Sequence, residues 1–219
     1  MDINHLVQTI AIYALPVLFA ITLHEAAHGY VARHFGDMTA YAQGRVSLNP
    51  LRHIDPVGTI VVPLIMLAFS GFLFGWAKPV PVNYSALRKP RPHMAWVAAA
   101  GPGANLLMAL AWALLLKIAL LLPENAFSDP LQLMSEAGIK VNLIFMFLNL
   151  LPILPLDGGR IVASLLPKRA AWQFAKLEPW GIPLLLLLMF VPIYGSNALN
   201  LILSPLLYES DALIRAMVL

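Results

Sequence analysis

Residues 6–31 read LVQTIAIYALPVLFAITLHEAAHGYV, and this stretch decides the fold class. Its first part, up to Leu23, has no charged residue, and a helix needs about 20 apolar residues to cross a bilayer. His24 and His28 then follow four residues apart, so both imidazoles project from one face of the helix. This spacing suits two zinc ligands, and Glu25 between them can take a proton from a metal-bound water. The stretch therefore predicts a metal site at the end of a membrane-spanning helix.

The composition of the chain also indicates an integral membrane protein. Its 219 residues are 60% apolar and 11% charged, whereas about 25% of the residues in an ordinary soluble domain are charged. Cysteine is absent, which excludes disulfides and a thiolate nucleophile, so a metal site must use His, Asp and Glu. We attribute the net charge of +3 to Lys and Arg in cytoplasmic loops, and expect no nucleic-acid partner.

The hydrophobic segments predict an all-α polytopic membrane protein with about five transmembrane helices. The clear segments are residues 6–31, 94–122, 141–166 and, shorter, 180–194. Residues 198–219 form a weaker fifth segment because three charged residues interrupt it. Residues 57–75 are also apolar, but glycine and proline interrupt them. This segment is expected to be a re-entrant element or a full span.

Loop charges predict the orientation in the membrane. Lys and Arg gather in residues 33–56, 76–93 and 167–178, whereas residues 123–137 carry acidic side chains without Lys or Arg. The positive-inside rule then places the N-terminus outside, and the two histidines near the cytoplasmic face of the membrane. It also favours re-entry of residues 57–75, because both flanks lie inside. A re-entrant backbone needs protein partners, which the strand-like stretches 44–48 and 78–82 could supply.

A third zinc ligand is needed, because catalytic zinc has three protein ligands and one open position. Asp157 is the main candidate, near the end of the apolar stretch NLLPILPLDGGR (149–160). A carboxylate in hydrocarbon costs about 2.5–3.5 kcal/mol on insertion scales and therefore has a partner. Pro152 and Pro155 should break the helix. Segments 6–31 and 141–166 run in the same direction, so Asp157 should reach the depth of the histidines.

Other interpretations of these residues stay open at this point. Asp157 could cap the turn into Gly158, or pair with Arg160 in a structural contact. If Asp157 is not the third ligand, His53 is the next candidate. Gly71 and Gly75 match the spacing of a helix-packing motif.

Three motifs occur in order along the chain: HEAAH (24–28), AGPGAN (100–105) and residues 149–159, with their LDG core at 156–158. Together they resemble the site-2 protease family of intramembrane zinc metalloproteases, over residues from about 15 to 165. Residues 44–50, 53–59 and 75–83 are similar to its compact bacterial branch, which implies a bacterial or archaeal inner membrane. Many relatives carry a PDZ domain where this chain has only residues 123–138, so we expect none there.

The resemblance implies a fold, a cofactor and a set of roles. Residues 1–166 would form a catalytic membrane core of three helices with short re-entrant or β-hairpin elements, and residues 167–219 a C-terminal helical hairpin. One Zn²⁺ per chain would be held by His24, His28 and Asp157. Glu25 would activate the water, and Asn149 would stabilise the oxyanion. Asn105 would be a structural polar residue at a helix start.

The implied function is hydrolysis of peptide bonds in or near transmembrane segments of membrane proteins, as in regulated intramembrane proteolysis. The partners would be transmembrane protein substrates and the lipid bilayer; the sequence makes no prediction of the oligomeric state. A metal-ion transporter is one alternative, but it does not explain a glutamate between the two histidines. A catalytically inactive membrane scaffold is the other, and the complete His-His-Asp set with Glu25 speaks against it.

Overall fold

The structure is a computed structural model, and it describes residues 3–61, 78–123, 125, 127–193 and 195–218. Most of these residues are helical and very few are in strands, which confirms the predicted all-α class. The long helices are α1 (Ile3–His34), α4 (Pro90–Leu121), α5 (Ser128–Leu150) and α9 (Ala198–Val218). The shorter elements are α2 (Thr39–Ala42), η1 (Pro50–Arg52), η2 (Pro56–Val61), η3 (Tyr84–Ala86), α6 (Asp157–Leu165), α7 (Lys168–Ala175), α8 (Glu178–Phe190), and the antiparallel two-residue strands β1 (Pro192–Ile193) and β2 (Ser196–Asn197).

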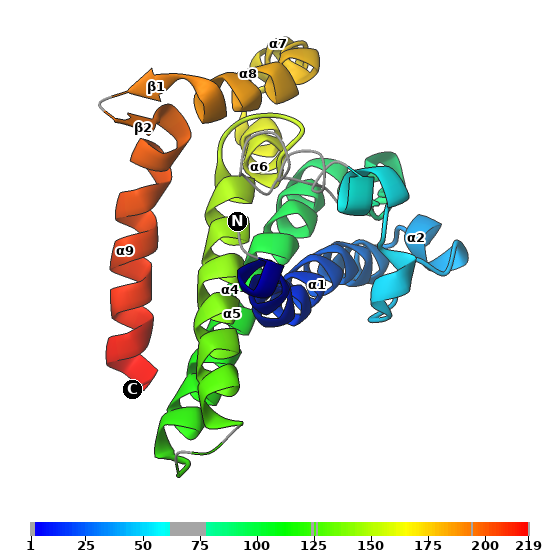
Figure 1. Cartoon of the computed structure of the whole chain (residues 1–219). Helices are drawn as coiled ribbons and strands as arrows, with labels where there is room; N and C mark the ends of the chain where they lie inside the picture. Colours follow the sequence, from blue (N-terminus) through cyan, green and yellow to red (C-terminus); the bar gives the residue numbers. More distant parts are fainter. Residues whose placement is uncertain (1–2, 62–77, 124, 126, 194, 219) are drawn as a thin grey trace.

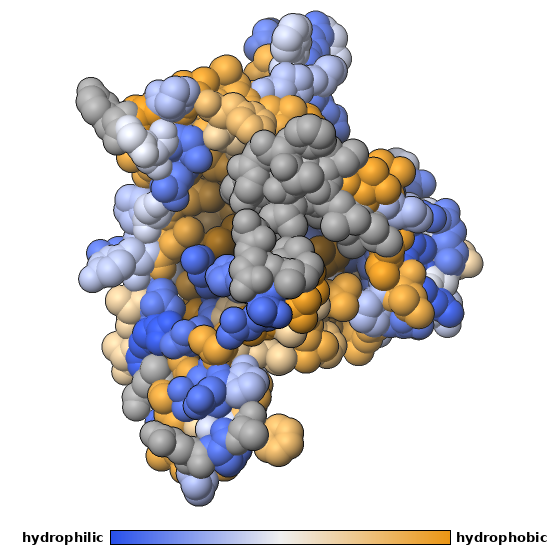
Figure 2. All heavy atoms as spheres, in the orientation of Figure 1, coloured by the Kyte–Doolittle hydropathy of each residue, from blue (hydrophilic) through white to orange (hydrophobic). Residues whose placement is uncertain are grey.

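Within the described residues, three helical segments are long and apolar enough to cross a membrane: Val7–His34, Pro90–Leu121 and Ser128–Leu150. Helix α8 is apolar but has 13 residues, about 20 Å of helix against a hydrocarbon core of about 30 Å. Helix α9 is longer but carries Glu209, Asp211 and Arg215. The fourth and fifth spans therefore stay predictions. Figure 2 shows hydrophobic residues over much of the visible face, with hydrophilic ones gathered near α7, near α2 and at the α4–α5 turn.

Helix α4 is the central element, because it packs against α1, α5 and α6 (Figure 1). Its contact with α5 is close: a Cβ added at Gly138 would lie 2.2 Å from Cδ2 of Trp112. A small residue at such a point lets two helices approach closely. Helix α9 packs on α5 and contributes Ile214 to the same buried cluster as Trp112. This arrangement fixes α4 beside the histidine-bearing helix α1.

The third predicted helix, residues 141–166, is wrong in extent. Helix α5 begins at Ser128, inside the predicted acidic loop, since Asp129 lies in its first turn, where the helix dipole favours a carboxylate. The predicted break at the prolines is confirmed. The chain leaves α5 before Pro152, as a residue preceding proline disfavours the helical conformation. A second helix, α6, restarts at Asp157.

The segments between α1 and α4 differ from the prediction. Residues 44–48 and 78–82 are not strands. Pro79 and Pro81 have no N–H to donate to a ladder, and Arg45 joins the two stretches instead, through the carbonyls of Lys78 and Pro79. Residues 56–61 form η2, whereas residues 62–75 lie outside the described residues, together with the predictions of re-entry and of a glycine packing motif there. Asn105 lies in the middle of α4, not at a helix start as predicted.

Candidate metal centre

Three donor atoms from α1 and α6 converge beside α4. Nε2 of His24 and Nε2 of His28 are 3.1 Å apart, and they lie 3.2 and 3.3 Å from Oδ2 of Asp157. In tetrahedral coordination with zinc–ligand distances of 2.0–2.1 Å, neighbouring ligand atoms are about 3.3 Å apart. All three residues are at most 9% exposed. The donors therefore have the spacing of three corners of a zinc tetrahedron.

The hydrogen bonds of the two imidazole rings determine which nitrogens are free for a metal. Nδ1 of His28 lies 2.7 Å from the carbonyl oxygen of Val97, which only accepts, so Nδ1 carries the proton. Nδ1 of His24 lies 2.6 Å from Oδ1 of Asn105 and donates to it. Each Nε2 then presents a lone pair to its neighbours. Two lone pairs and a carboxylate oxygen at such distances repel one another, and a cation between them removes that repulsion.

Asn105 is fixed by a further polar residue. Its Nδ2 donates to the carbonyl of Ala20 at 3.2 Å and to Oδ1 of Asn142 at 3.0 Å, so its oxygen faces His24. Nδ2 of Asn142 donates in turn to Gly138 O at 2.8 Å. Such outer partners orient metal-ligating histidines. Asn142 was absent from the predicted site; its polarity within an apolar helix was the one available signal.

Gly101 leaves room for the metal site on α4. A Cβ added there would lie 2.5 Å from Cε1 of His24 and 2.5 Å from Nε2 of His28. At Gly103, in the same helix, an added Cβ would meet nothing within 4 Å. Oδ2 of Asp157 is buried and has no hydrogen-bond partner within the described part of the chain. A buried carboxylate oxygen that accepts no hydrogen bond and faces two imidazole nitrogens fits a bound cation.

The loop between α5 and α6 brings Asp157 to the histidines. Its backbone closes so tightly on α6 that a Cβ at Gly158 would lie 2.2 Å from Leu150 O, and one at Gly159 2.5 Å from Leu154 N. Helix α8 crosses the same loop, where a Cβ at Gly181 would lie 1.4 Å from Leu154 O. Glycine is required at these close approaches. The position of Asp157 thus depends on backbone contacts with two helices.

Arg160 is directed away from Asp157. Its guanidinium lies 5.3 Å from the ring centroid of Tyr84 and its Nη2 lies 3.9 Å from Oε1 of Glu178. Burial raises the pKa of the Tyr84 phenol above its usual value, so this ring stays neutral. Within the described residues, the structural pairing of Asp157 with Arg160 is therefore not found, and the carboxylate faces the histidines instead.

The other predicted site residues lie at different positions. Glu25 is half-buried on α1, and its Oε2 accepts a hydrogen bond from the backbone N–H of Val80 at 2.7 Å. Asn149 lies in the last turn of α5, where its Nδ2 donates to Phe145 O at 3.0 Å. Within the described residues no hydrogen bond joins Asn149 to the three metal donors. His53 is buried and bonded to Ser47 O, and it does not belong to the donor cluster.

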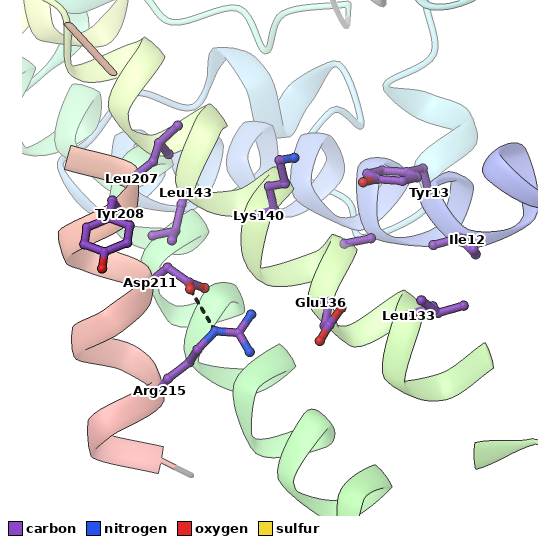
Figure 3. Close-up of a pocket in the computed structure, with 11 residues that line it drawn as sticks. Ile12, Tyr13, Leu133, Glu136, Lys140, Leu143, Leu207, Tyr208, Asp211 and Arg215 are labelled. Atoms are coloured by element: carbon purple, nitrogen blue, oxygen red, sulfur yellow. Dashed lines mark hydrogen bonds and ion pairs between the residues drawn. The ribbon is translucent and has the colours of Figure 1, made fainter. Parts of the chain in front are cut away.

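A separate cleft of about 460 Å³ lies between α1, α5 and α9, and the three metal donors do not line it (Figure 3). Asp211 and Arg215, one turn apart on α9, form an ion pair along one side of it, at 2.7 Å. Glu136 and Lys140 of α5 also line the cleft, with their charged groups pointing in different directions (Figure 3). Charged side chains in a spanning helix usually face such a cavity rather than lipid. The cleft explains how α5 accommodates Glu136, which was predicted to lie in a loop.

Comparison with known proteins places these features in a family. The model of "Peptidase family M50" matches residues 117–191. The Bacillus subtilis protein named "Putative zinc metalloprotease YwhC" is 40% identical over 188 residues, which cover 84% of this chain and 82% of that protein. Two proteins named "Putative zinc metalloprotease Rip2", from Mycolicibacterium smegmatis and Mycobacterium tuberculosis H37Rv, are each 30% identical over 80% of this chain and 65% of their own length. No solved structure matches the chain at comparable significance.

A helical membrane fold with a His-Glu-x-x-His helix and a distant aspartate defines the class of membrane-embedded zinc metalloproteases. The chain belongs to peptidase family M50, the site-2 protease family. It is a multi-pass membrane protein and a zinc-dependent hydrolase. Only residues 122–127 connect α4 to α5, so no PDZ domain is inserted between these helices.

Proposed function

We propose that this protease cleaves peptide bonds in or near the transmembrane segments of other membrane proteins, as in regulated intramembrane proteolysis. The observation that carries the proposal is the position of the three donors on helices that belong to the membrane region. His24 and His28 lie in a segment apolar enough to span, and Asp157 follows the end of another. The reaction would therefore take place at membrane depth, where a transmembrane segment can reach it.

In this proposal each site residue has a separate role. His24, His28 and Asp157 hold the metal, and Glu25 takes a proton from the attacking water and delivers it to the leaving amine. Zinc, when bound, lowers the pKa of water from 15.7 to about 7 and polarises the scissile carbonyl. Asn149 contributes the amide donor for the developing oxyanion. In the present geometry one of its N–H groups is used by Phe145 O, so the other N–H is the one left for this task.

The substrate must expose its peptide bond before it can react, because a helix hides its carbonyls in internal hydrogen bonds. We propose that an unwound substrate segment lies extended beside residues 44–48 or 78–82. Support comes from the location of the second stretch: Val80 contacts Glu25 directly. The proposal also assigns residues 1–166 to a catalytic core and residues 167–219 to a C-terminal unit that packs on α5 through α9.

The orientation is proposed from charge. His28 lies six residues before the end of α1 at His34, or about 9 Å along the helix. Arg33 and the basic residues Arg88, Lys89 and Arg91 lie around the ends of α1 and α4. Basic residues flank the cytoplasmic ends of spanning helices. We therefore propose an inner-membrane enzyme with its N-terminus outside and its metal centre near the cytoplasmic side.

The proposal is tested with purified wild type, Glu25→Gln and Asp157→Ala in detergent micelles. Zinc per chain is measured by elemental analysis. Cleavage is followed with a fluorophore–quencher peptide of about 20 apolar residues containing a central helix-breaking Asn-Pro pair. Wild type should hold one zinc and cleave, Glu25→Gln should hold zinc without cleaving, and Asp157→Ala should lose both. Cleavage by Glu25→Gln at the wild-type rate would refute the mechanism, and full zinc in Asp157→Ala would refute the ligand set.

A further inference from the structure

The backbone N–H of Val80 is the group that contacts Glu25. It donates to Oε2 of Glu25 at 2.7 Å, a charge-assisted bond of the stronger kind. Pro79 and Pro81 flank Val80 and have no N–H, so Val80 is the one residue of these three that can donate. Pro79 also has a fixed φ, and Pro81 restricts Val80 to an extended conformation. Val80 thus supplies the one backbone N–H of residues 79–81, in a restricted conformation.

Arg45 holds the other end of the same peptide unit. Its Nη2 lies 3.3 Å from Pro79 O and 2.6 Å from Lys78 O, and its Nη1 donates to Arg52 O. Pro79 C=O and Val80 N–H belong to one planar peptide group, in which the two bonds point in opposite directions. A donor that fixes the direction of Pro79 C=O therefore also fixes the direction of Val80 N–H. Arg45 therefore contacts the C=O of this peptide group, and Glu25 contacts its N–H.

The segment is also seated on α1 and anchored at its far end. A Cβ added at Gly29, one turn beyond Glu25, would lie 3.0 Å from Cγ2 of Val46 and 3.3 Å from Cγ1 of Val80. The absence of a side chain at Gly29 thus leaves room for the side chains of Val46 and Val80 to pack against α1. Further along, Oδ2 of the fully buried Asp37 accepts from the N–H of Asn83 at 2.7 Å. Little freedom remains for residues 78–83.

We propose that Arg45 is a positioning residue for Glu25, acting through the Pro79–Val80 peptide. It directs Val80 N–H at one carboxylate oxygen and so leaves the other oxygen to receive the proton of water. The inference rests on the proposed role of Glu25 as the proton acceptor. A guanidinium is suited to the task because its planar fork contacts several carbonyls at once, which the single ammonium of lysine cannot do.

The direct test is hydrogen exchange at the Val80 amide, measured by mass spectrometry on zinc-loaded and metal-free protein. Because Pro79 and Pro81 have no amide, a peptide covering residues 78–82 reports on very few amides. Arg45→Ala should speed exchange there about 10-fold or more, as local opening becomes easier. Arg52→Ala is the matched control, since Arg52 Nη1 donates to Gly44 O and not to residues 78–80. Unchanged exchange in Arg45→Ala would overturn the inference.

The kinetic test separates positioning from general damage. Arg45→Ala and Val80→Pro should each lower kcat on the quenched peptide about 10–100-fold, the range seen for outer-shell partners. Zinc content should stay unchanged, any rise in KM should be smaller than the fall in kcat, and Arg45→Lys should recover only part of the loss. Val80→Ala, which keeps the N–H, should lose less kcat than Val80→Pro. A rise in KM alone, or loss of zinc, would overturn the inference by assigning residues 78–80 to substrate binding or to folding. If Glu25→Gln is inactive while Val80→Pro is normal, the inference fails and the proposed function stands.

Discussion

Gly101 determines how closely α4 can approach the two histidines. Gly101→Ala places a methyl group 2.5 Å from Nε2 of His28, within the space that a metal ion needs, so we expect it to lose most bound zinc. Gly103→Ala is the matched control, because nothing lies within 4 Å of its new methyl group. Elemental analysis of both purified variants measures the difference. Equal zinc in the two would show that the metal does not lie against α4.

Asn105 orients His24 and should influence metal affinity without binding metal. Asn105→Leu keeps a similar volume but removes the acceptor for Nδ1 of His24. Loss of such a partner lowers metal affinity about 10–100-fold. Competition with a zinc chelator measures this affinity, with Asn200→Leu as a control because Asn200 is exposed on α9 and contacts Ser196. An unchanged affinity in Asn105→Leu would contradict the orienting role.

For individual residues, the sequence predicted the three metal donors better than it predicted the polar residues that hold those donors in place. His24, His28 and Asp157 were predicted to meet, and their atoms lie within 3.3 Å of one another. Zinc ligands in a chain without cysteine must be His, Asp or Glu, so the sequence offers few candidate residues. The partnership of Asn105 with His24, and of Asn142 with Asn105, depends on how α1, α4 and α5 cross. A helical pattern in one segment does not contain that information.

Among the elements, α8 has a structural role beyond its apolar composition. Gly181→Ala would place a methyl group 1.4 Å from Leu154 O, and backbone cannot move aside as a side chain can. Overpacking costs about 1–3 kcal/mol, so we expect a lower melting temperature in micelles. Zinc affinity should fall as well, because Leu154 belongs to the loop that places Asp157. Leu184→Ala, a 43% exposed position of the same helix, should leave both unchanged. Normal zinc affinity in Gly181→Ala would separate α8 from the metal centre.

Helix identity was easier to predict than helix ends. The first span was predicted at residues 6–31 and occupies 3–34, and the second at 94–122 occupies 90–121. In the third, the acidic residues of 123–137 were taken to mark a loop, but Glu136 lies in α5 and lines a cleft between helices. Hydropathy along a sequence cannot distinguish a charge in water outside the membrane from one in a cleft within the fold. Proline, by contrast, acts locally, and the break after α5 was predicted correctly.

At the scale of the whole molecule, the proposed orientation can be tested because the chain has no cysteine. We expect Asp129→Cys, near the start of α5, to react with a membrane-impermeant thiol reagent in intact cells. Lys168→Cys, at the start of α7, should react only after the membrane is permeabilised. The two positions lie on opposite sides of the proposed span. The reverse pattern of labelling would place the metal centre at the outer face.

The metal centre also has a consequence for the order in which the enzyme is made. His24 and His28 are synthesised early, but Asp157 follows His28 by 129 residues in the chain (157 − 28). An unfinished chain inserted up to α5 has two ligands and lacks the carboxylate that completes the set. Synthesis runs at about 5–20 residues per second, so this incomplete state lasts for seconds in every copy. Since Gly181 of α8 lies against the loop that precedes Asp157, the protease should acquire its metal, and with it any power to cut neighbouring proteins, only after α8 has been made.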